Sequence, residues 1–213
     1  MKTTAQIHAI IEELKKLYPD AICSLDYGKD YELLFSVRLA AQCTDARVNL
    51  VTPALFDRFP TLEAFAQATP EEVGEYIRSC GFWRAKAKDI VGSAQMLLRD
   101  FDGRVPDTME ALLKLPGVGR KTANLILGDI YGKEGYVCDT HCIRITGRLG
   151  ITDGSKDPLK VEQQLRQVIP PEESNNFCHR MVLHGRALCM ARSPQCGECP
   201  LRELCDYGKE QAT

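Results

Sequence analysis

The sequence predicts an all-α protein built from many short helices. Apolar residues recur at helical spacing in almost every segment, and no window alternates apolar and polar residues as a strand does. Threonine, aspartate, glycine and proline stand where one apolar stripe stops and the next begins, as they do at helix ends. No repeat period or low-complexity segment interrupts this pattern.

The helices expected in the first half follow from these stripes and end signals. Ile7, Ile10, Ile11 and Leu14 lie at the spacing of one helix face. Threonine precedes two later stripes as a plausible N-cap, and the second of these also has a proline at its first helical position and a closing glycine. The other helices expected here are residues 31–42, 47–59 with an interruption at Pro53, 61–68, 69–81 and 86–101.

The second half continues the helical pattern. Asp107, followed three residues later by Glu110, indicates a capping-box start. Ala123, Ile126 and Ile130 mark the core-facing stripe of the helix that follows a glycine turn. The helices expected in this half are residues 106–115, 120–130, 139–150, 158–169 and 175–189.

Composition and charge constrain the partner only weakly. The net charge is −2 and the pI about 6.1, so the bulk composition does not mark a nucleic-acid binder. Between Ser174 and Arg202, four arginines stand against one glutamate, which permits a local anionic partner; a solvated basic face is the alternative. No stretch approaches the ~20 apolar residues that span a bilayer. The N-terminus has no continuous apolar region, so we expect a cytoplasmic protein.

Four of the ten cysteines crowd into the last 25 residues. A secreted disulfide scaffold would be shorter and would carry a signal peptide, so we expect the six scattered cysteines to be reduced and mostly buried. The terminal four, Cys189, Cys196, Cys199 and Cys205, lie close enough in sequence to converge on one metal centre. Zinc sites usually pair their ligands in two CxxC-type knuckles, whereas this wider wrap favours an iron–sulfur cluster, with zinc and coincidence as alternatives.

The segment LPGVGRKTANLIL, from Leu115 to Leu127, places two glycines and an Arg–Lys pair at a helix start. Gly117 and Gly119 allow positive φ and close approach, so backbone N–H groups can reach a phosphate at the positive end of the helix dipole. This pattern indicates a helix-hairpin-helix grip on a nucleic-acid backbone, with a plain turn between two helices as the alternative.

Two residues near this hairpin are candidates for chemistry. Lys121 lies in the first turn of the second helix, which disfavours an ammonium and therefore suits a nucleophilic lysine. A phosphate-contacting or solvated lysine is the alternative. Asp139, eighteen residues later, precedes a new helix. It is either that helix's N-cap or a carboxylate that stabilises positive charge or moves a proton.

Taken together, these features resemble one family. LPGVGRKTAN, then DTH leading a helix, then the Cys-x6-Cys-x2-Cys-x5-Cys ending match in order and spacing the endonuclease III branch of the helix-hairpin-helix DNA glycosylases. AAQCTD, at Ala40–Asp45, resembles an early segment of that branch. The resemblance spans nearly the whole chain.

The resemblance implies a two-lobed all-α helix-hairpin-helix DNA glycosylase fold with a C-terminal iron–sulfur cluster loop. A six-helix lobe containing the hairpin would span residues 23–133, and the cluster lobe would combine residues 1–22 with residues 134–213. The implied activity is that of a bifunctional DNA glycosylase and AP lyase of base excision repair. Such an enzyme acts as a monomer on double-stranded DNA containing a damaged base or abasic site. It removes oxidised pyrimidines and nicks the strand 3′ to the abasic site by β-elimination through a lysine Schiff base.

The resemblance also implies residue roles. Lys121 would be the nucleophile and Asp139 the essential carboxylate, and the four terminal cysteines would hold a 4Fe–4S cluster. Gln42 would fill the gap left by the flipped base. Phe82 stands where the family more often has an aliphatic wedge, which leaves the damage and opposite-base preferences open. The DNA-contacting residues implied are Gln42, Phe82, Leu115, Gly117, Val118, Gly119, Arg120, Thr140 and His141.

Two rival functions fit parts of the sequence. An adenine glycosylase of the same superfamily shares the cluster and the carboxylate, but such enzymes lack a lysine at the position of Lys121. A non-catalytic DNA-binding or redox-sensing protein would keep the hairpin and the cluster; the presence of both Lys121 and Asp139 counts against it.

Overall fold

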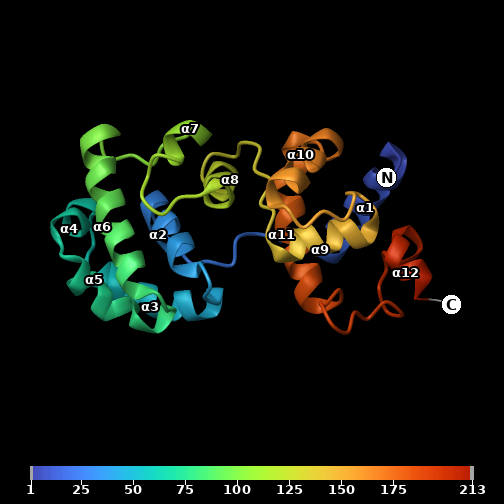
Figure 1. Ribbon diagram of the computed structural model, residues 1–213, viewed down its shortest axis with the longest axis horizontal. Helices are drawn as coiled ribbons and strands as arrows, with labels where there is room; N and C mark the ends of the chain where they lie inside the picture. Colours follow the sequence, from blue (N-terminus) through green and yellow to red (C-terminus); the bar gives the residue numbers. More distant parts are fainter. Residues whose placement is uncertain (1, 212–213) are drawn as a thin grey trace. The chain divides into compact units, whose positions relative to one another are not determined.

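The computed structural model describes residues 2–211, which form helices and turns without a β-strand (Figure 1). The chain divides into two compact units. Cys23–Tyr131 form one unit, and the other described residues, up to Ile22 and from Gly132 onward, form the second. No helix among residues 2–211 is long and apolar enough to cross a membrane.

The unit Cys23–Tyr131 is a bundle around one long helix, α6 (Trp83–Asp100). α6 packs against α4, α5 and α2, and α2 in turn packs against α3 and α8. A short 3-10 helix, η1 (Arg78–Cys80), connects α5 to the turn before α6. The other helices of the unit are α2 (Asp30–Ala40), α3 (Asp45–Arg58), α4 (Leu62–Gln67), α5 (Pro70–Ile77), α7 (Met109–Leu112) and α8 (Arg120–Asp129).

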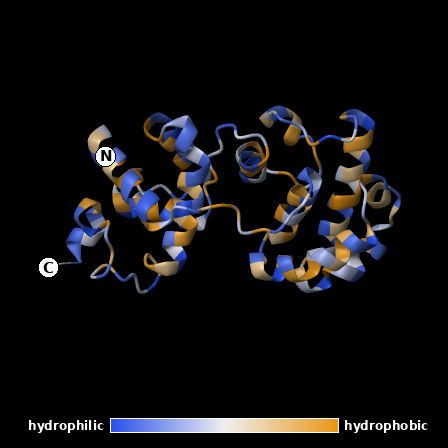
Figure 2. Cartoon of the chain, turned by 180° about the vertical axis from the view of Figure 1, so that it is seen from behind, coloured by the Kyte–Doolittle hydropathy of each residue, from blue (hydrophilic) through white to orange (hydrophobic). Residues whose placement is uncertain are grey.

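Aromatic rings fill the centre of this unit. Phe65 is fully buried, and its ring centroid lies 5.0 Å from that of Phe35 and 5.1 Å from that of Phe59. Figure 2 shows hydrophobic and hydrophilic residues intermixed along the helices, as expected of helices that bury one face. Truncating one such buried aromatic ring costs about 3–5 kcal/mol, so this cluster is a major contributor to the stability of the unit.

The second unit is built on α9 (Thr140–Leu149) and α11 (Ser174–Ala187), which pack against each other. The N-terminal helix α1 (Thr4–Leu17) packs against α11, and the C-terminal helix α12 (Asp206–Glu210) packs against α9, so both ends of the described chain belong to this unit (Figure 1). The remaining elements are α10 (Pro158–Val168) and two 3-10 helices, η2 (Pro171–Glu173) and η3 (Arg202–Leu204).

The structure confirms the all-helical prediction and corrects three local details. α3 continues through Pro53 instead of being interrupted there. α7 is a single turn, and its N-cap is Thr108, whose hydroxyl accepts the Ala111 N–H; the expected capping box at Asp107 does not form. The C-terminal loop contains η3 and α12, which the periodicity did not predict because each has five residues or fewer.

Candidate functional site

The predicted hairpin is a tight turn between α7 and α8. The Val118 N–H donates to the Leu115 carbonyl at 3.2 Å, and Gly117 has φ of +71°, a conformation that favours glycine. Gly119 is the N-cap of α8 with φ of −102°, so the expectation of positive φ at both glycines is correct only for Gly117. The Leu115 side chain is buried in the core, which leaves only its backbone for a ligand.

An ion pair supports the underside of this turn. Arg38 Nε, on α2, donates to Asp89 Oδ2, on α6, at 2.7 Å. A Cβ atom added at Gly117 would lie 2.5 Å from Arg38 Nε and 2.6 Å from Asp89 Oδ2. The hairpin therefore rests directly on two helices of the unit, and only glycine fits at the contact point.

The outer side of the turn is open. A Cβ atom added at Gly119 would meet no atom within 4 Å. Because Gly119 has no side chain to cap α8, the first backbone amides of this helix face the open side without a side-chain cap. Arg120 and Lys121 form the exposed first turn of α8. An anion is favoured at such a helix start.

Gln42 and Phe82, the predicted DNA-inserting residues, have unusual backbone conformations. Their φ angles are 54° and 47°, in the left-handed region that bulky residues rarely adopt. Both side chains are exposed, and Phe82 exposes 69% of its surface. An exposed aromatic ring held on a strained turn suits insertion between base pairs.

Asp139 is the N-cap of α9. Its Oδ1 accepts the Cys142 N–H at 2.7 Å, so the capping role weighed from the sequence is present. Thr140 is exposed beside it, whereas His141 is half-buried with its ring against Gly185 of α11. His141 Nδ1 also lies 3.1 Å from Arg144 Nη2. Asp139 and its neighbours lie in one unit and Lys121 in the other.

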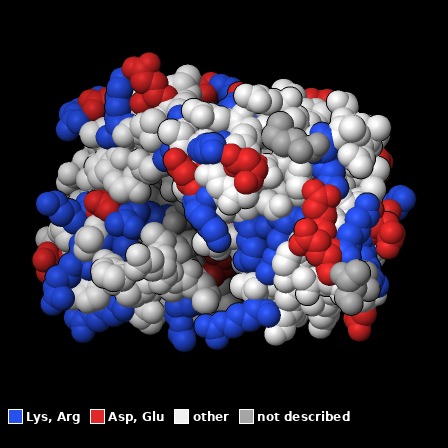
Figure 3. Space-filling model, turned by 45° about the vertical axis from the view of Figure 1, so that its right-hand side comes forward, with Lys and Arg blue, Asp and Glu red and all other residues white. Residues whose placement is uncertain are grey.

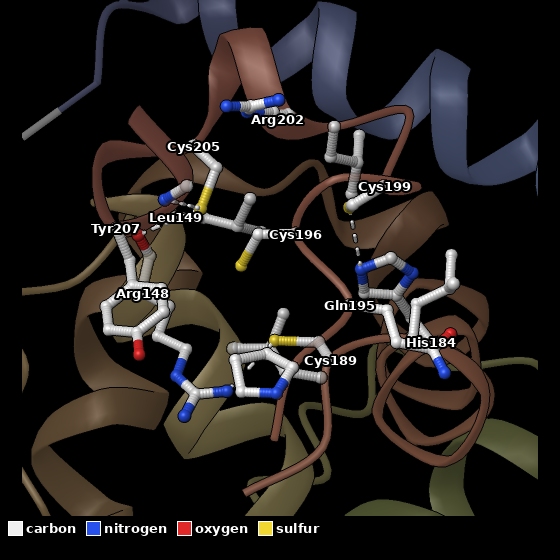
Figure 4. A pocket seen from close by; sticks show the side chains of 15 residues that line it. Arg148, Leu149, His184, Cys189, Gln195, Cys196, Cys199, Arg202, Cys205 and Tyr207 are labelled. Carbon is white, nitrogen blue, oxygen red and sulfur yellow. Dashed lines mark hydrogen bonds between the residues drawn. The ribbon is translucent and has the colours of Figure 1, made fainter. Parts of the chain in front are cut away.

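The four terminal cysteines surround one pocket (Figure 4). Their Sγ atoms face a common space, and apolar residues such as Ile145, Leu188 and Leu201 form part of the wall. No group of three or more His, Cys, Asp or Glu side chains in residues 2–211 is placed to hold a single metal ion. Four thiols spread around an apolar pocket match the iron corners of a cubane cluster better than one tetrahedral ion.

Three of the four sulfur atoms already have polar neighbours. Arg148 Nη1 lies 3.3 Å from Cys189 Sγ, and the Gly208 N–H donates to Cys205 Sγ at 3.3 Å. His184 Nε2 lies 3.6 Å from Cys199 Sγ. Hydrogen bonds to thiolate sulfur stabilise its negative charge, so these donors fit an iron–sulfur cluster.

Burial sets the ionisation of this pocket. Burial raises the pKa of the Cys199 thiol, the Leu201 backbone amide opposes this effect, and the three neighbouring thiols raise the pKa further. Burial also lowers the pKa of His184 to about 4, so the imidazole is neutral at neutral pH. The Tyr18 hydroxyl lies 3.1 Å from His184 Nδ1. If that hydroxyl donates to Nδ1, the ring proton is on Nε2 and faces Cys199.

Sequence reasoning missed two cations. Arg148, on α9, donates to the carbonyls of Met190 at 2.8 Å and Ala191 at 2.9 Å as well as approaching Cys189, and so holds the start of the cysteine loop. Lys86, on α6, exposes 1% of its surface. Its signal in the sequence is its position on the apolar stripe that continues through Ile90.

Comparison with known proteins agrees with this geometry. Residues 35–171 match the HhH-GPD superfamily of base excision DNA repair proteins, and residues 189–205 match the iron-sulfur binding domain of endonuclease III. Endonuclease III of Synechocystis sp. (strain PCC 6803) is 50% identical over 193 residues, which cover 90% of this chain and 88% of that protein. The chain belongs to the endonuclease III family.

Other members of the family match over its full length. Endonuclease III of Bacillus subtilis (strain 168) is 39% identical over 211 residues, which cover 99% of this chain and 96% of that protein. A solved structure of a trapped covalent endonuclease III–DNA intermediate, an estranged-adenine complex, superposes with a TM-score of 0.93 at 42% identity and covers 100% of both chains. This endonuclease III family member is a DNA glycosylase and AP lyase of base excision repair, and it carries a 4Fe–4S cluster.

Proposed function

We propose that this enzyme removes oxidised pyrimidines from duplex DNA with Lys121 as nucleophile and Asp139 as the essential carboxylate. The observation that carries the proposal is the exposed first turn of α8, where Lys121 follows an uncapped glycine hairpin. An amine held there stands beside the backbone amides that would bind a DNA phosphate, so one helix start both grips the strand and presents the nucleophile.

The chemistry follows from the two side chains. The neutral Lys121 amine attacks C1′ of the damaged nucleotide, the glycosidic bond breaks, and the base leaves with the bonding electrons. The sugar ring opens to a Schiff base, a proton is lost from C2′, and the 3′ phosphate leaves by β-elimination. Asp139 accepts the proton that the lysine must lose and stabilises positive charge at the sugar.

The other residues act on the DNA. Gln42 takes the space of the flipped base, and Phe82 separates the neighbouring base pairs. The hairpin backbone from Leu115 to Arg120 holds a phosphate, and Thr140 and His141 contact the strand near Asp139. Lys and Arg side chains gather in patches on the face drawn in Figure 3, although the net charge is −2. The enzyme acts as a monomer in the cytoplasm.

The four cysteines are the proposed ligands of the cluster. Cys189, Cys196, Cys199 and Cys205 surround the pocket, and the matching iron-sulfur binding segment begins at the first and ends at the last of them. When bound, the cluster supplies a structural or DNA-sensing centre and takes no part in cleaving the glycosidic bond. Arg148 and the Gly208 amide orient the sulfur atoms on the protein side.

Borohydride trapping tests the nucleophile. A duplex carrying thymine glycol or an abasic site should give a covalent adduct with the wild-type enzyme and none with Lys121→Ala. Lys114→Ala is the matched control, because Lys114 is an exposed lysine on the other side of the same hairpin. If Lys121→Ala still forms the adduct, another amine is the nucleophile.

Asp139→Asn separates the two roles of Asp139. Asparagine caps helices as well as aspartate does, so the variant should unfold at the same urea concentration as wild type while base excision is lost. Asp139→Ala should lose base excision and also about 1 kcal/mol of unfolding free energy. Full activity of Asp139→Asn would mean that Asp139 serves only as the N-cap of α9.

A further inference from the structure

Lys86 is a buried cation that the proposed chemistry does not use. Its ammonium Nζ donates to the Leu39 carbonyl at 2.8 Å and to the Cys80 carbonyl at 2.8 Å, and the residue exposes 1% of its surface. Burial lowers the pKa of Lys86, which reflects the cost of keeping a charge away from water. A charge is retained in such a place only where its hydrogen bonds compensate that cost.

The two carbonyls belong to different segments that end beside each other. Leu39 lies at the C-terminal end of α2, and Cys80 is the last residue of η1. Carbonyls at a helix C-terminus have no partner within the helix and carry the negative end of its dipole. The Lys86 ammonium therefore closes both helix ends at once and ties together two segments that are distant in sequence.

Each of these carbonyls lies two or three residues before a residue proposed to enter the DNA. Gln42 comes three residues after Leu39, and Phe82 comes two residues after Cys80. Among residues 2–211, three residues other than glycine have positive φ, and Gln42 and Phe82 are two of them. Such a conformation is strained for a residue with a side chain, so the surrounding structure must hold it.

The exposed side chains do not provide that support themselves. Phe82 exposes 69% of its surface, so its ring is not anchored in the core. Additional contacts lie at the same junction. The Lys86 backbone N–H donates to the Phe82 carbonyl at 3.1 Å, and Asp89, one turn further along α6, pairs with Arg38 beneath the hairpin. One face of α6 thus supports both inserting residues and the hairpin.

We propose that Lys86 is a positioning residue that holds Gln42 and Phe82 in the one arrangement that enters a DNA duplex. The inference rests on the proposed function, in which Gln42 fills the vacated space and Phe82 separates the base pairs. This role of Lys86 should matter for duplex DNA and not for single-stranded DNA. A duplex must be opened by the two residues together, whereas an abasic site in single-stranded DNA has no partner base to replace and no stack to open.

Lys86→Met tests the inference, because methionine has a similar length and no N–H donor. Lys88→Met is the matched control, since Lys88 lies two residues along the same helix and is exposed. The readout is the single-turnover strand-cleavage rate at an abasic site in duplex DNA, divided by the rate at the same site in single-stranded DNA. Both rates are taken per molecule that borohydride can trap, so a fraction of misfolded protein does not change the ratio.

We expect Lys86→Met to lower the duplex rate about tenfold to a hundredfold, as a displacement of about 1 Å does, with a single-strand rate within about twofold of wild type. Lys86→Gln, which keeps one N–H donor, should lie between Lys86→Met and wild type. If both rates fall equally in Lys86→Met, the role is merely structural and the inference is wrong. If poor folding leaves too little Lys86→Met to assay, Lys86→Gln decides by the same ratio.

Phe82→Ala separates failure of this inference from failure of the proposed function. An unchanged duplex-to-single-strand ratio in Phe82→Ala means that Phe82 is not a wedge, and the proposed function is wrong at that residue. A lowered ratio in Phe82→Ala with an unchanged ratio in Lys86→Met overturns the role of Lys86 alone. If both roles are right, the double variant Lys86→Met/Phe82→Ala should have a duplex-to-single-strand ratio no more than about twofold below that of the more impaired single variant. The two residues then act through one step, so their effects do not add.

Discussion

The two glycines of the hairpin allow the fold and the DNA contact to be tested separately. Gly117 has positive φ and rests on the Arg38–Asp89 ion pair, whereas Gly119 has ordinary backbone geometry and open space beside it. Substituting alanine at each position adds the same methyl group two residues apart, on opposite sides of one turn. Gly117→Ala should therefore damage stability first, and Gly119→Ala should damage DNA binding alone.

The structure gives the magnitudes. Alanine at φ of +71° costs about 1–2 kcal/mol, and its Cβ, 2.5 Å from Arg38 Nε, must separate the ion pair from Asp89 at a further cost of about 1–2 kcal/mol. Gly117→Ala is therefore expected to lose about 2–4 kcal/mol of unfolding free energy. Gly119→Ala should stay within about 0.5 kcal/mol of wild type, because its loss as a cap is offset by a less flexible unfolded chain.

Affinity for DNA, and not unfolding free energy, is the property that Gly119→Ala should lose. A methyl group at Gly119 occupies the space through which a phosphate would approach the first amides of α8. We expect Gly119→Ala to weaken binding of a duplex with an uncleavable abasic analogue about tenfold, or about 1.4 kcal/mol. Urea denaturation followed by circular dichroism measures stability, and fluorescence anisotropy measures binding. Wild-type affinity in Gly119→Ala would refute the phosphate-binding role, and equal stability of the two variants would refute the steric argument at Gly117.

Two further predictions concern the cluster loop and the buried thiols. Arg148→Met removes the donor to Cys189 Sγ and the contacts to the Met190 and Ala191 carbonyls. In the presence of a chelator, the visible absorption of the cluster should therefore decay faster in this variant than in wild type. An unchanged decay rate would show that Arg148 does not hold the cysteine loop. Burial raises the pKa of Cys80 to about 11, from 9.0, with the nearby Cys43 thiol adding to the effect. The folded protein keeps this proton while the unfolded chain loses it, so the stabilisation is complete below pH 9 and is lost between pH 9 and 11. From pH 8 to pH 10, wild type should therefore lose about 1.4 kcal/mol more unfolding free energy than Cys80→Ala, and parallel pH profiles in urea titrations would contradict this.

The longer helices were predictable because each carries its own signals, whereas the short η3 and α12 do not. Thr61 and Thr69 cap α4 and α5 as their positions suggested, and Asp139 caps α9. The mistakes arose where tertiary contacts outweigh local preference. Pro53 costs α3 one backbone hydrogen bond, but the packed face of that helix, including Val48 and Leu55, continues across it.

The cysteine pocket and the glycine turn of the candidate site could be predicted from the sequence, whereas the side chains that support them could not. Cysteine spacing and the glycine hairpin are local patterns, so the pocket and the turn could be expected from the sequence. Lys86 and Arg148 act on carbonyls of distant segments, and a carbonyl has the same identity at every residue. No pattern of side chains can therefore reveal which backbone oxygen a buried cation will bind.

Buried Lys86 also differs from the exposed cations in how salt should affect its contribution to DNA binding. Lys86 is buried, donates to two protein carbonyls and neutralises no phosphate, so Lys86→Met should weaken duplex binding without changing the slope of log Kd against log salt. Exposed Arg120, at the start of α8, is proposed to meet a phosphate, and Arg120→Ala should reduce that slope by about 1. Anisotropy titrations at several salt concentrations distinguish the two. A reduced slope in Lys86→Met would mean that the lysine reaches the DNA, which its burial in the present arrangement does not allow.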